Sequence, residues 1–246
     1  MLSQIFRPSR FSSLIVADAK NLSRDPILLL VMVMSALMPV LFTTFKADLN
    51  QFGLQFFDLP NLSTYVAPIA FLMPAYLIGW VFGFLLLEDR DDHTLLAVET
   101  TAVGKQGFLI YRLTIASIIS AILAAAAATY ILPPMPLYLS LALILMVALQ
   151  TATTSLILLA LAGNKVEGLA LSKLLNVGGL FPLFAIIPNP LRYIAGLYPS
   201  YWVGELMDLS AQAYLPQYAA LLLAIIIHLA WIAFMFTKTL NKAEQL

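Results

Sequence analysis

Long apolar stretches separated by short polar segments run along most of the 246-residue chain. Each stretch is about 20 residues long, the length that an α-helix needs to cross the hydrocarbon core of a bilayer. In the first stretch, Asp25 and Pro26 suit a helix start, and Pro39 is expected to kink the helix. The pattern predicts six membrane spans, over residues 27–45, 64–87, 110–132, 137–163, 169–187 and 217–237.

Two further segments are predicted to touch the membrane without crossing it. Residues 10–24 carry an apolar helical face made of Phe11, Leu14, Ile15 and Leu22. Such a helix is typical of the headgroup plane. Residues 188–216 are too polar to span but rich in tyrosine, which favours the interface between lipid and water. We expect short re-entrant helices there, in an all-α chain with one transmembrane domain over residues 1–246.

Composition supports an integral membrane protein, because 61% of the residues are hydrophobic, 11% are charged, and mean hydropathy is +0.92. Soluble domains carry about a quarter charged residues. The formal net charge of zero does not indicate nucleic acid as a partner. The chain has no cysteine, which excludes disulfides, thiolate metal sites and cysteine nucleophiles.

The distribution of lysine and arginine predicts the orientation. With six spans both termini lie on one side, and the loops on that side carry an excess of cations when it is cytoplasmic. Eleven cations fall on the side of the termini and two, Lys46 and Arg192, on the other. We therefore expect a plasma-membrane protein of the bacterial inner-membrane type, with both termini in the cytoplasm.

A charged segment, residues 88–109, separates the second and third spans. Together with the start of the third span, the stretch from Glu88 to Arg112 includes five carboxylates and three cations. So many charges cannot lie in hydrocarbon. We expect a structured cytoplasmic loop, with Arg112 reaching the headgroups. A divalent cation site is one interpretation of its acidic start, and a solvated helix start is the other and more typical one. The residues concerned are Asp89, Asp91, Asp92 and His93.

Polar residues at membrane depth admit two interpretations each. The fourth span carries Gln150, Thr151, Thr153, Thr154 and Ser155. These side chains either bond helix backbone or line a substrate path. His228 in the sixth span is either a neutral hydrogen-bonded histidine or a proton relay. Asp18, within the interfacial apolar face, is either locally paired or in contact with another subunit.

Catalytic motifs are absent from the sequence. There is no G-x-S-x-G, no H-E-x-x-H and no G-x-x-x-x-G-K-[ST] phosphate-binding loop. No aspartate or glutamate falls within the six predicted spans, so an ion-coupled mechanism lacks its usual carboxylate. If transport is driven by ATP, the ATPase must be another polypeptide.

The order of these features resembles the permease subunits of type-2 ATP-binding-cassette exporters. In the charged segment the matching residues are Glu88, Thr94, Leu95, Leu96, Thr100 and Arg112. The segment departs from the family pattern at His93, where glycine is usual, and at Thr101-Ala102, where Thr-Pro is usual. NKVEGLALSKLLN (164–176) and PSYWVGELM (199–207) are similar to the drug-exporting branch that includes fluoroquinolone export permeases.

The resemblance implies a permease that binds no cofactor itself and docks a cytoplasmic ATPase carrying ATP and Mg. It also implies pairing with a second copy or a related permease through the first and fifth spans. The residues implied for ATPase coupling are Asp18, Arg24, Asp25, Glu88, Asp89, Thr94, Thr100 and Lys105. Those implied for the translocation path or its outer gate are Gln150, Thr154, Asn176, Tyr198, Tyr201, Trp202 and Glu205.

Three functions therefore remain open. The first is a permease subunit of an ATP-driven exporter, which is not itself an enzyme and whose cargo is drug-like, amphipathic or lipid-like. The second is an ion-coupled transporter or channel that works without an ATPase. The third is a membrane scaffold.

Overall fold

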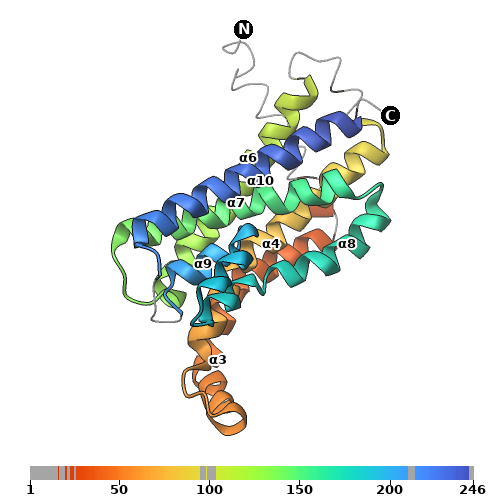
Figure 1. Cartoon of the computed structure of the whole chain (residues 1–246). Helices are drawn as coiled ribbons and strands as arrows, with labels where there is room; N and C mark the ends of the chain where they lie inside the picture. Colours follow the sequence, from red (N-terminus) through yellow and green to blue (C-terminus); the bar gives the residue numbers. More distant parts are fainter. Residues whose placement is uncertain are drawn as a thin grey trace.

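The described part of the chain is helical throughout its regular structure. The computed structural model describes residues 16, 20, 23, 24, 26–94, 98, 104–209 and 214–243, and these contain no β-strand. The longer helices are α3 (Pro26–Phe57), α4 (Leu62–Asp91), α6 (Gly104–Ile131), α7 (Leu137–Leu161), α8 (Lys165–Gly178) and α10 (Gln217–Ala243). Between α8 and α10 lie the short helices η1 (Phe181–Ile186), η2 (Pro190–Leu197) and α9 (Tyr201–Leu206) (Figure 1).

Six helical segments are long and apolar enough to cross a membrane, which confirms the predicted number of spans. Five of them are α3, α4, α6, α7 and α10, and the sixth joins α8 to η1 over Lys165–Ile186. The fold is therefore that of an all-α integral membrane protein. The short helices expected between the fifth and sixth spans are present as well.

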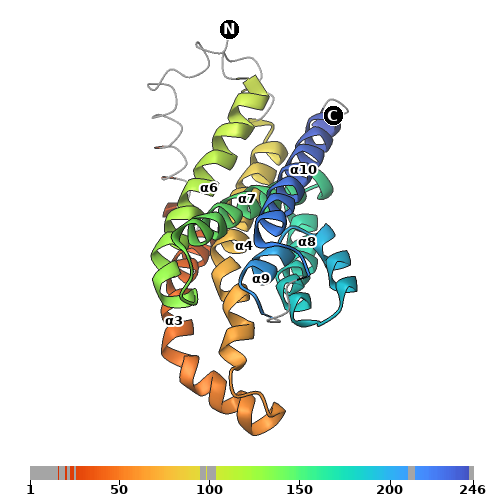
Figure 2. The ribbon, with the colours of Figure 1, turned by 60° about the vertical axis from the view of Figure 1, so that its left-hand side comes forward.

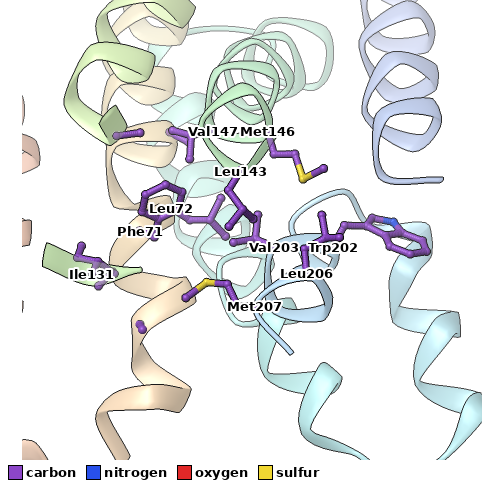
Figure 3. Close-up of a cluster of buried hydrophobic side chains, with 14 of the residues drawn as sticks. Phe71, Leu72, Ile131, Leu143, Met146, Val147, Trp202, Val203, Leu206 and Met207 are labelled. Atoms are coloured by element: carbon purple, nitrogen blue, oxygen red, sulfur yellow. The ribbon is translucent and has the colours of Figure 1, made fainter. Parts of the chain in front are cut away.

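α4 and α7 form the centre of the bundle. They pack against each other, and α7 also contacts α6 and α10. Gly79 and Gly83 permit this contact, because a Cβ atom on Gly79 would lie 2.7 Å from Thr154 Cβ and one on Gly83 2.7 Å from Leu158 Cδ1. Small residues at this small-x-x-x-small spacing let the backbones of two helices approach closely. Figure 3 shows the neighbouring core, where α9 adds side chains to those of α4 and α7.

The first helix is longer than predicted. Residues 46–62 are not a loop, since α3 continues to Phe57 and α4 begins at Leu62. Nothing in residues 46–57 stops a helix, whereas Asp58 adopts a positive φ of 55° and Pro60 follows it. The end of α3 and the start of α4 form a hairpin that projects from the bundle (Figures 1 and 2).

The charged segment is largely helical where it is described. α4 extends through the carboxylates to Asp91, and α6 begins at Gly104. α4, α6, α8 and α10 thus all have one terminus at the end of the bundle where α4 stops (Figure 1). We call this the charged end, and the opposite end, which holds η1, η2 and α9, the aromatic end. Of the predicted interfacial helix over 10–24, only Val16, Lys20, Ser23 and Arg24 are among the described residues.

Candidate functional site

Four consecutive residues at the end of α4 contact three other helices. Successive residues of an α-helix point about 100° apart, so a run of charges there reaches in several directions. Glu88 pairs with Lys165 at the start of α8, and Asp89 pairs with Arg112 of α6. Arg90 bonds the end of α7, and Asp91 accepts from the Lys165 backbone N–H. We call this set the charged junction: Glu88, Asp89, Arg90, Asp91, Arg112 and Lys165.

Asp89 and Arg112 form the buried part of the charged junction. Their charged atoms lie 3.0 Å apart, and the side chains are 14% and 4% exposed. The Arg112 guanidinium also lies 4.9 Å from the centroid of the Phe108 ring. The prediction that Arg112 reaches the headgroups is wrong, because a carboxylate inside the bundle neutralises it. A buried pair of this kind fixes α4 against α6.

Arg90 caps the end of α7. Its Nη1 donates to the Leu159 carbonyl at 3.1 Å and its Nη2 to the Ala162 carbonyl at 3.0 Å. The last carbonyls of a helix have no partner within the helix and carry its partial negative charge. A guanidinium from α4 therefore stabilises the end of α7 and holds the turn toward α8 in place.

Glu88 and Asp91 both hold the first residue of α8. Lys165 Nζ lies 3.2 Å from Glu88 Oε2, and Lys165 N donates to Asp91 Oδ2 at 3.0 Å. The start of α8 is further ordered by Asn164, whose side chain accepts from Glu167 N at 2.9 Å as an N-cap. Glu167 in turn accepts from Gly163 N at 2.6 Å. The loop between α7 and α8 is thus bound to the end of α4.

The residues implied for ATPase coupling occupy different environments. Glu88 and Asp89 face other helices of the bundle, whereas Arg24 and Thr94 are exposed and Lys105 is partly exposed. Asp18, Asp25 and Thr100 lie outside the described residues. Sequence reasoning did not assign Arg90 or Lys165 a role in the site. Their partners are 69 to 77 residues away in the chain, so no local pattern reveals them.

A metal site at the start of this segment has no geometric support in the described residues. Asp89 is engaged by Arg112, and Asp91 by the Lys165 N–H. No group of three or more His, Asp or Glu side chains in the described ranges is arranged to hold a metal ion.

His93 follows the end of α4 with a positive φ of 58°. Its N–H donates to the Arg90 carbonyl at 3.1 Å, which closes the helix end. The left-handed conformation is the one that glycine adopts most readily after a helix, and histidine is among the residues that tolerate it. Although histidine stands at position 93 where the family pattern has glycine, the backbone there keeps the left-handed conformation that glycine would adopt.

A cavity of about 440 Å³ opens between α3, α4 and α8. Its walls are mostly apolar, and no lysine, arginine, aspartate or glutamate lines it. Tyr76, Trp80 and Asn176 are its polar members, and the Trp80 indole N–H is buried without a hydrogen-bond partner among the described residues. The full lining is Leu30, Val31, Met34, Met38, Ile69, Met73, Tyr76, Leu77, Trp80, Asn176, Gly179 and Leu180. Of the residues implied for the translocation path, Asn176 lies directly in this wall.

Gln150 and Thr154 lie behind the cavity wall. Both are essentially buried, at 0% and 1% exposure, in the contact between α4 and α7. Gln150 Nε2 is 3.5 Å from the hydroxyl of Tyr76, which does line the cavity. Tyr76 also interacts with the hydroxyls of Tyr198 and Ser200. Tyr76 therefore connects the cavity to the polar interior and to the aromatic end, a role that sequence reasoning did not assign to it.

At the aromatic end, Glu205 is the centre of a buried polar cluster. Arg192 Nη2 lies 2.9 Å from Glu205 Oε1, with side chains 1% and 5% exposed. The Tyr193 hydroxyl donates to Oε1 at 2.9 Å and the Tyr201 hydroxyl to Oε2 at 2.8 Å. Burial and the neighbouring Glu205 carboxylate raise the pKa of both tyrosines. We call these four residues the Glu205 cluster.

The Glu205 cluster binds the short helices into one unit. Arg192 also donates to the Ala185 and Ile187 carbonyls at 3.2 Å, so η1, η2 and α9 share one cation. Trp202 Nε1 donates to the Gly196 carbonyl at 2.9 Å. Arg192 was counted only as a cation of the outer side, yet it is the partner of the implied gate residue Glu205. The available signal was that Arg192 is the only cation in an aromatic segment whose carboxylates are Glu205 and Asp208.

Comparisons with known proteins agree with this architecture. Residues 18–236 match the family described as fluoroquinolones export permease protein Rv2686c-like. The chain is 28% identical over 199 residues to the fluoroquinolones export permease protein Rv2686c of Mycobacterium tuberculosis (strain ATCC 25618 / H37Rv), covering 76% of this chain and 77% of the relative. The protein MT2760 of the same name from strain CDC 1551 / Oshkosh matches to the same extent. No solved structure shows significant similarity to the chain. Since the family match covers nearly the whole chain, this protein belongs to the Rv2686c-like family of fluoroquinolone export permeases.

Proposed function

We propose that this chain is the membrane-spanning subunit of an ATP-driven drug exporter and that it forms the path of the cargo. The observation that carries the proposal is the family match over residues 18–236. The mycobacterial relatives are named for fluoroquinolone export, so fluoroquinolones are the first cargo to test.

The cavity between α3, α4 and α8 is the proposed cargo site. Apolar and methionine side chains suit a range of flat hydrophobic molecules, and a few polar groups set their orientation. The Trp80 N–H and the Asn176 amide offer hydrogen bonds, but no ionised side chain lines the wall. We infer an amphipathic cargo that places a hydrogen-bonding group and no ionised group against this wall.

A separate cytoplasmic ATPase is the proposed energy source, since the chain has no phosphate-binding loop. The excess of lysine and arginine in the segments at the charged end supports a cytoplasmic location for that end. Thr94 and Arg24 are exposed there and available to a docking partner.

A second permease copy, or a related permease, is the proposed partner within the membrane. The cavity borders α3 and α8, and both helices present large apolar side chains away from the bundle. Leu30 and Val33 of α3 are 59% and 48% exposed, and Leu174 and Val177 of α8 are 69% and 56% exposed. Pairing across these faces would close the cavity between two chains.

Co-expression of this chain with a candidate ATP-binding-cassette ATPase, followed by purification, tests the proposal. We expect the two proteins to co-purify and the complex, in liposomes, to move a fluorescent fluoroquinolone only when ATP is hydrolysed. A complex whose ATPase carries an inactivating substitution in its phosphate-binding loop is the control, and it should not transport. If the purified permease alone moves the drug under a proton or sodium gradient, the chain is instead an ion-coupled transporter.

A further inference from the structure

α8 is fixed by polar contacts at its two ends and by apolar packing between them. At its start, Lys165 pairs with Glu88 through Nζ at 3.2 Å and bonds Asp91 through its backbone N–H at 3.0 Å. At its end, Ser200 Oγ donates to the Gly178 carbonyl at 2.6 Å. One end of α8 is thus joined to the charged junction and the other to the aromatic end.

Glu167 in the first turn of α8 also interacts electrostatically with Arg90 of α4, and beyond that turn no hydrogen bond or ion pair joins a described side chain of α8 to another long helix. Ser172 Oγ bonds the Leu169 carbonyl of its own helix at 2.9 Å. Gly168 lies against Leu87 and Phe84 of α4, an apolar contact that has no directional bond to break. The polar contacts at its two ends therefore set the position of α8, a helix of 14 residues that is roughly 20 Å long at the helical rise.

The end of α8 forms part of the cavity wall. Asn176 lies in its last turn, and Gly179 and Leu180 follow directly. A displacement of α8 along its axis would move these residues relative to Tyr76 and Trp80, which belong to α4. The shape of the cavity therefore depends on where α8 stands relative to α4.

We propose that Lys165 is a positioning residue: its pair with Glu88 at the charged end fixes where α8 stands relative to α4, and a change in that pair alters the cavity wall at the other end of α8. The inference rests on the proposed function, because an ATPase docked at the charged end would supply that change. Lys165 does not touch the cargo. It acts by holding the start of α8 to Glu88.

The ion pair of Lys165 and Glu88 is too exposed to contribute much to stability, so a coupling role can be tested separately. The side chains of Lys165 and Glu88 are 40% and 45% exposed, and ion pairs in such surroundings add little to stability. Loss of Lys165 Nζ should therefore leave the fold intact. The hydrogen bond to Asp91 should also remain, because its donor is the backbone N–H of Lys165. A defect in Lys165→Ala would then report on coupling.

The test uses the reconstituted complex of permease and ATPase and measures drug molecules moved per ATP hydrolysed. We expect Lys165→Ala to lower this ratio by about fivefold or more while ATP hydrolysis continues, which is the usual scale of coupling between sites. Lys173→Ala is the matched control, because Lys173 is exposed on the same helix and has no ion pair among the described residues. Its ratio should equal that of the unsubstituted protein.

Exchanging the charges of Glu88 and Lys165 tests whether their ion pair, rather than either residue alone, is needed for coupling. Glu88→Lys should lower the ratio, and Glu88→Lys combined with Lys165→Glu should restore at least part of it. A ratio for Lys165→Ala equal to that of Lys173→Ala, or a swap that restores nothing, would overturn the role of the pair. Absence of ATP-driven transport in the unsubstituted complex would instead overturn the proposed function, and the inference with it.

Discussion

The guanidinium of Arg112 lies 3.0 Å from the carboxylate of Asp89, and the two side chains are 4% and 14% exposed. This contact makes the charged segment part of the helix packing, because it joins the end of α4 to the third turn of α6. The exposed pair of Glu88 and Lys165 lies one residue away and contacts α8. Two adjacent carboxylates at the end of α4 thus have different roles: Asp89 stabilises the helix packing, and Glu88, as proposed, acts in coupling.

Arg112→Met should destabilise the protein strongly. It leaves the Asp89 carboxylate in the bundle without its cation, and breaking a buried pair in this way costs about 3–5 kcal/mol. The midpoint of thermal unfolding in detergent, followed by size-exclusion chromatography, measures the effect. The double variant Asp89→Leu with Arg112→Met should recover much of the loss, because no charge remains buried. An unchanged midpoint for the single variant would show that the pair is not formed in the membrane protein.

The Glu205 cluster should make stability depend on alkaline pH. Burial and the Glu205 carboxylate raise the pKa of Tyr193 and Tyr201, so the folded state favours their neutral phenols. This contribution is complete below the unfolded-state value of about 10 and is lost as the pH rises through the raised pKa. Tyr193→Phe with Tyr201→Phe should therefore be less stable than the unsubstituted protein near neutral pH, and the difference should shrink at higher pH.

Unfolding midpoints of both proteins between about pH 8 and pH 11 give this difference directly. Tyr130→Phe is the control, since Tyr130 is 63% exposed and lies outside the Glu205 cluster. If the gap between the double variant and the unsubstituted protein stays constant with pH, the phenols do not contribute through their protonation.

His93→Gly should stabilise the protein by about 1 kcal/mol. His93 has a φ of 58°, and a left-handed residue with a Cβ atom is strained where glycine is not. The shift of the thermal midpoint measures the gain. Asp92→Gly is the matched control, because Asp92 has a φ of −85° and glycine there only adds freedom to the unfolded chain. Equal shifts for the two variants would rule out the conformational explanation.

The pattern of apolar residues along the sequence was sufficient to predict the six-span architecture, but it did not predict the polar contacts between helices. Six long runs of hydrophobic residues each form a helical segment of membrane length. In hydrocarbon the backbone N–H and C=O groups have no water to bond, so they bond one another within the helix. The end of the first helix was missed because Lys46, Asp48 and Asn50 look like a loop, although Asn50 Oδ1 accepts from Ser63 N at 2.9 Å to close a helical hairpin. Polarity marks where a span leaves the membrane, not where its helix stops.

The candidate site shows the same limit. Glu88 and Glu205 were singled out from the sequence, but their partners Lys165 and Arg192 were not. Glu88 and Lys165 are 77 residues apart, so only the packing of α8 on α4 brings them together. The cavity could not be predicted either, because α8 supplies part of its wall and is far from α3 and α4 in the chain.

Trp80→Phe should separate cargo binding from stability. The Trp80 N–H is buried in the cavity wall without a partner among the described residues, so its removal should not lower the unfolding midpoint. If the N–H donates to a carbonyl of the bound drug, its loss should weaken binding by about 3- to 10-fold, the equivalent of one hydrogen bond. Quenching of intrinsic fluorescence by a fluoroquinolone, titrated on the purified protein, measures the affinity.

Trp231→Phe is the matched control and should behave in the opposite way. Trp231 Nε1 donates to the Leu197 carbonyl at 2.9 Å and ties α10 to η2, outside the cavity lining. Its replacement leaves that carbonyl unpaired, so the unfolding midpoint should fall while drug affinity stays unchanged. Equal affinities for the Trp80 and Trp231 variants would place the cargo elsewhere than between α3, α4 and α8. A loss of affinity confined to Trp80→Phe would assign the Trp80 side chain to the cargo site, because only Trp80 lines the cavity.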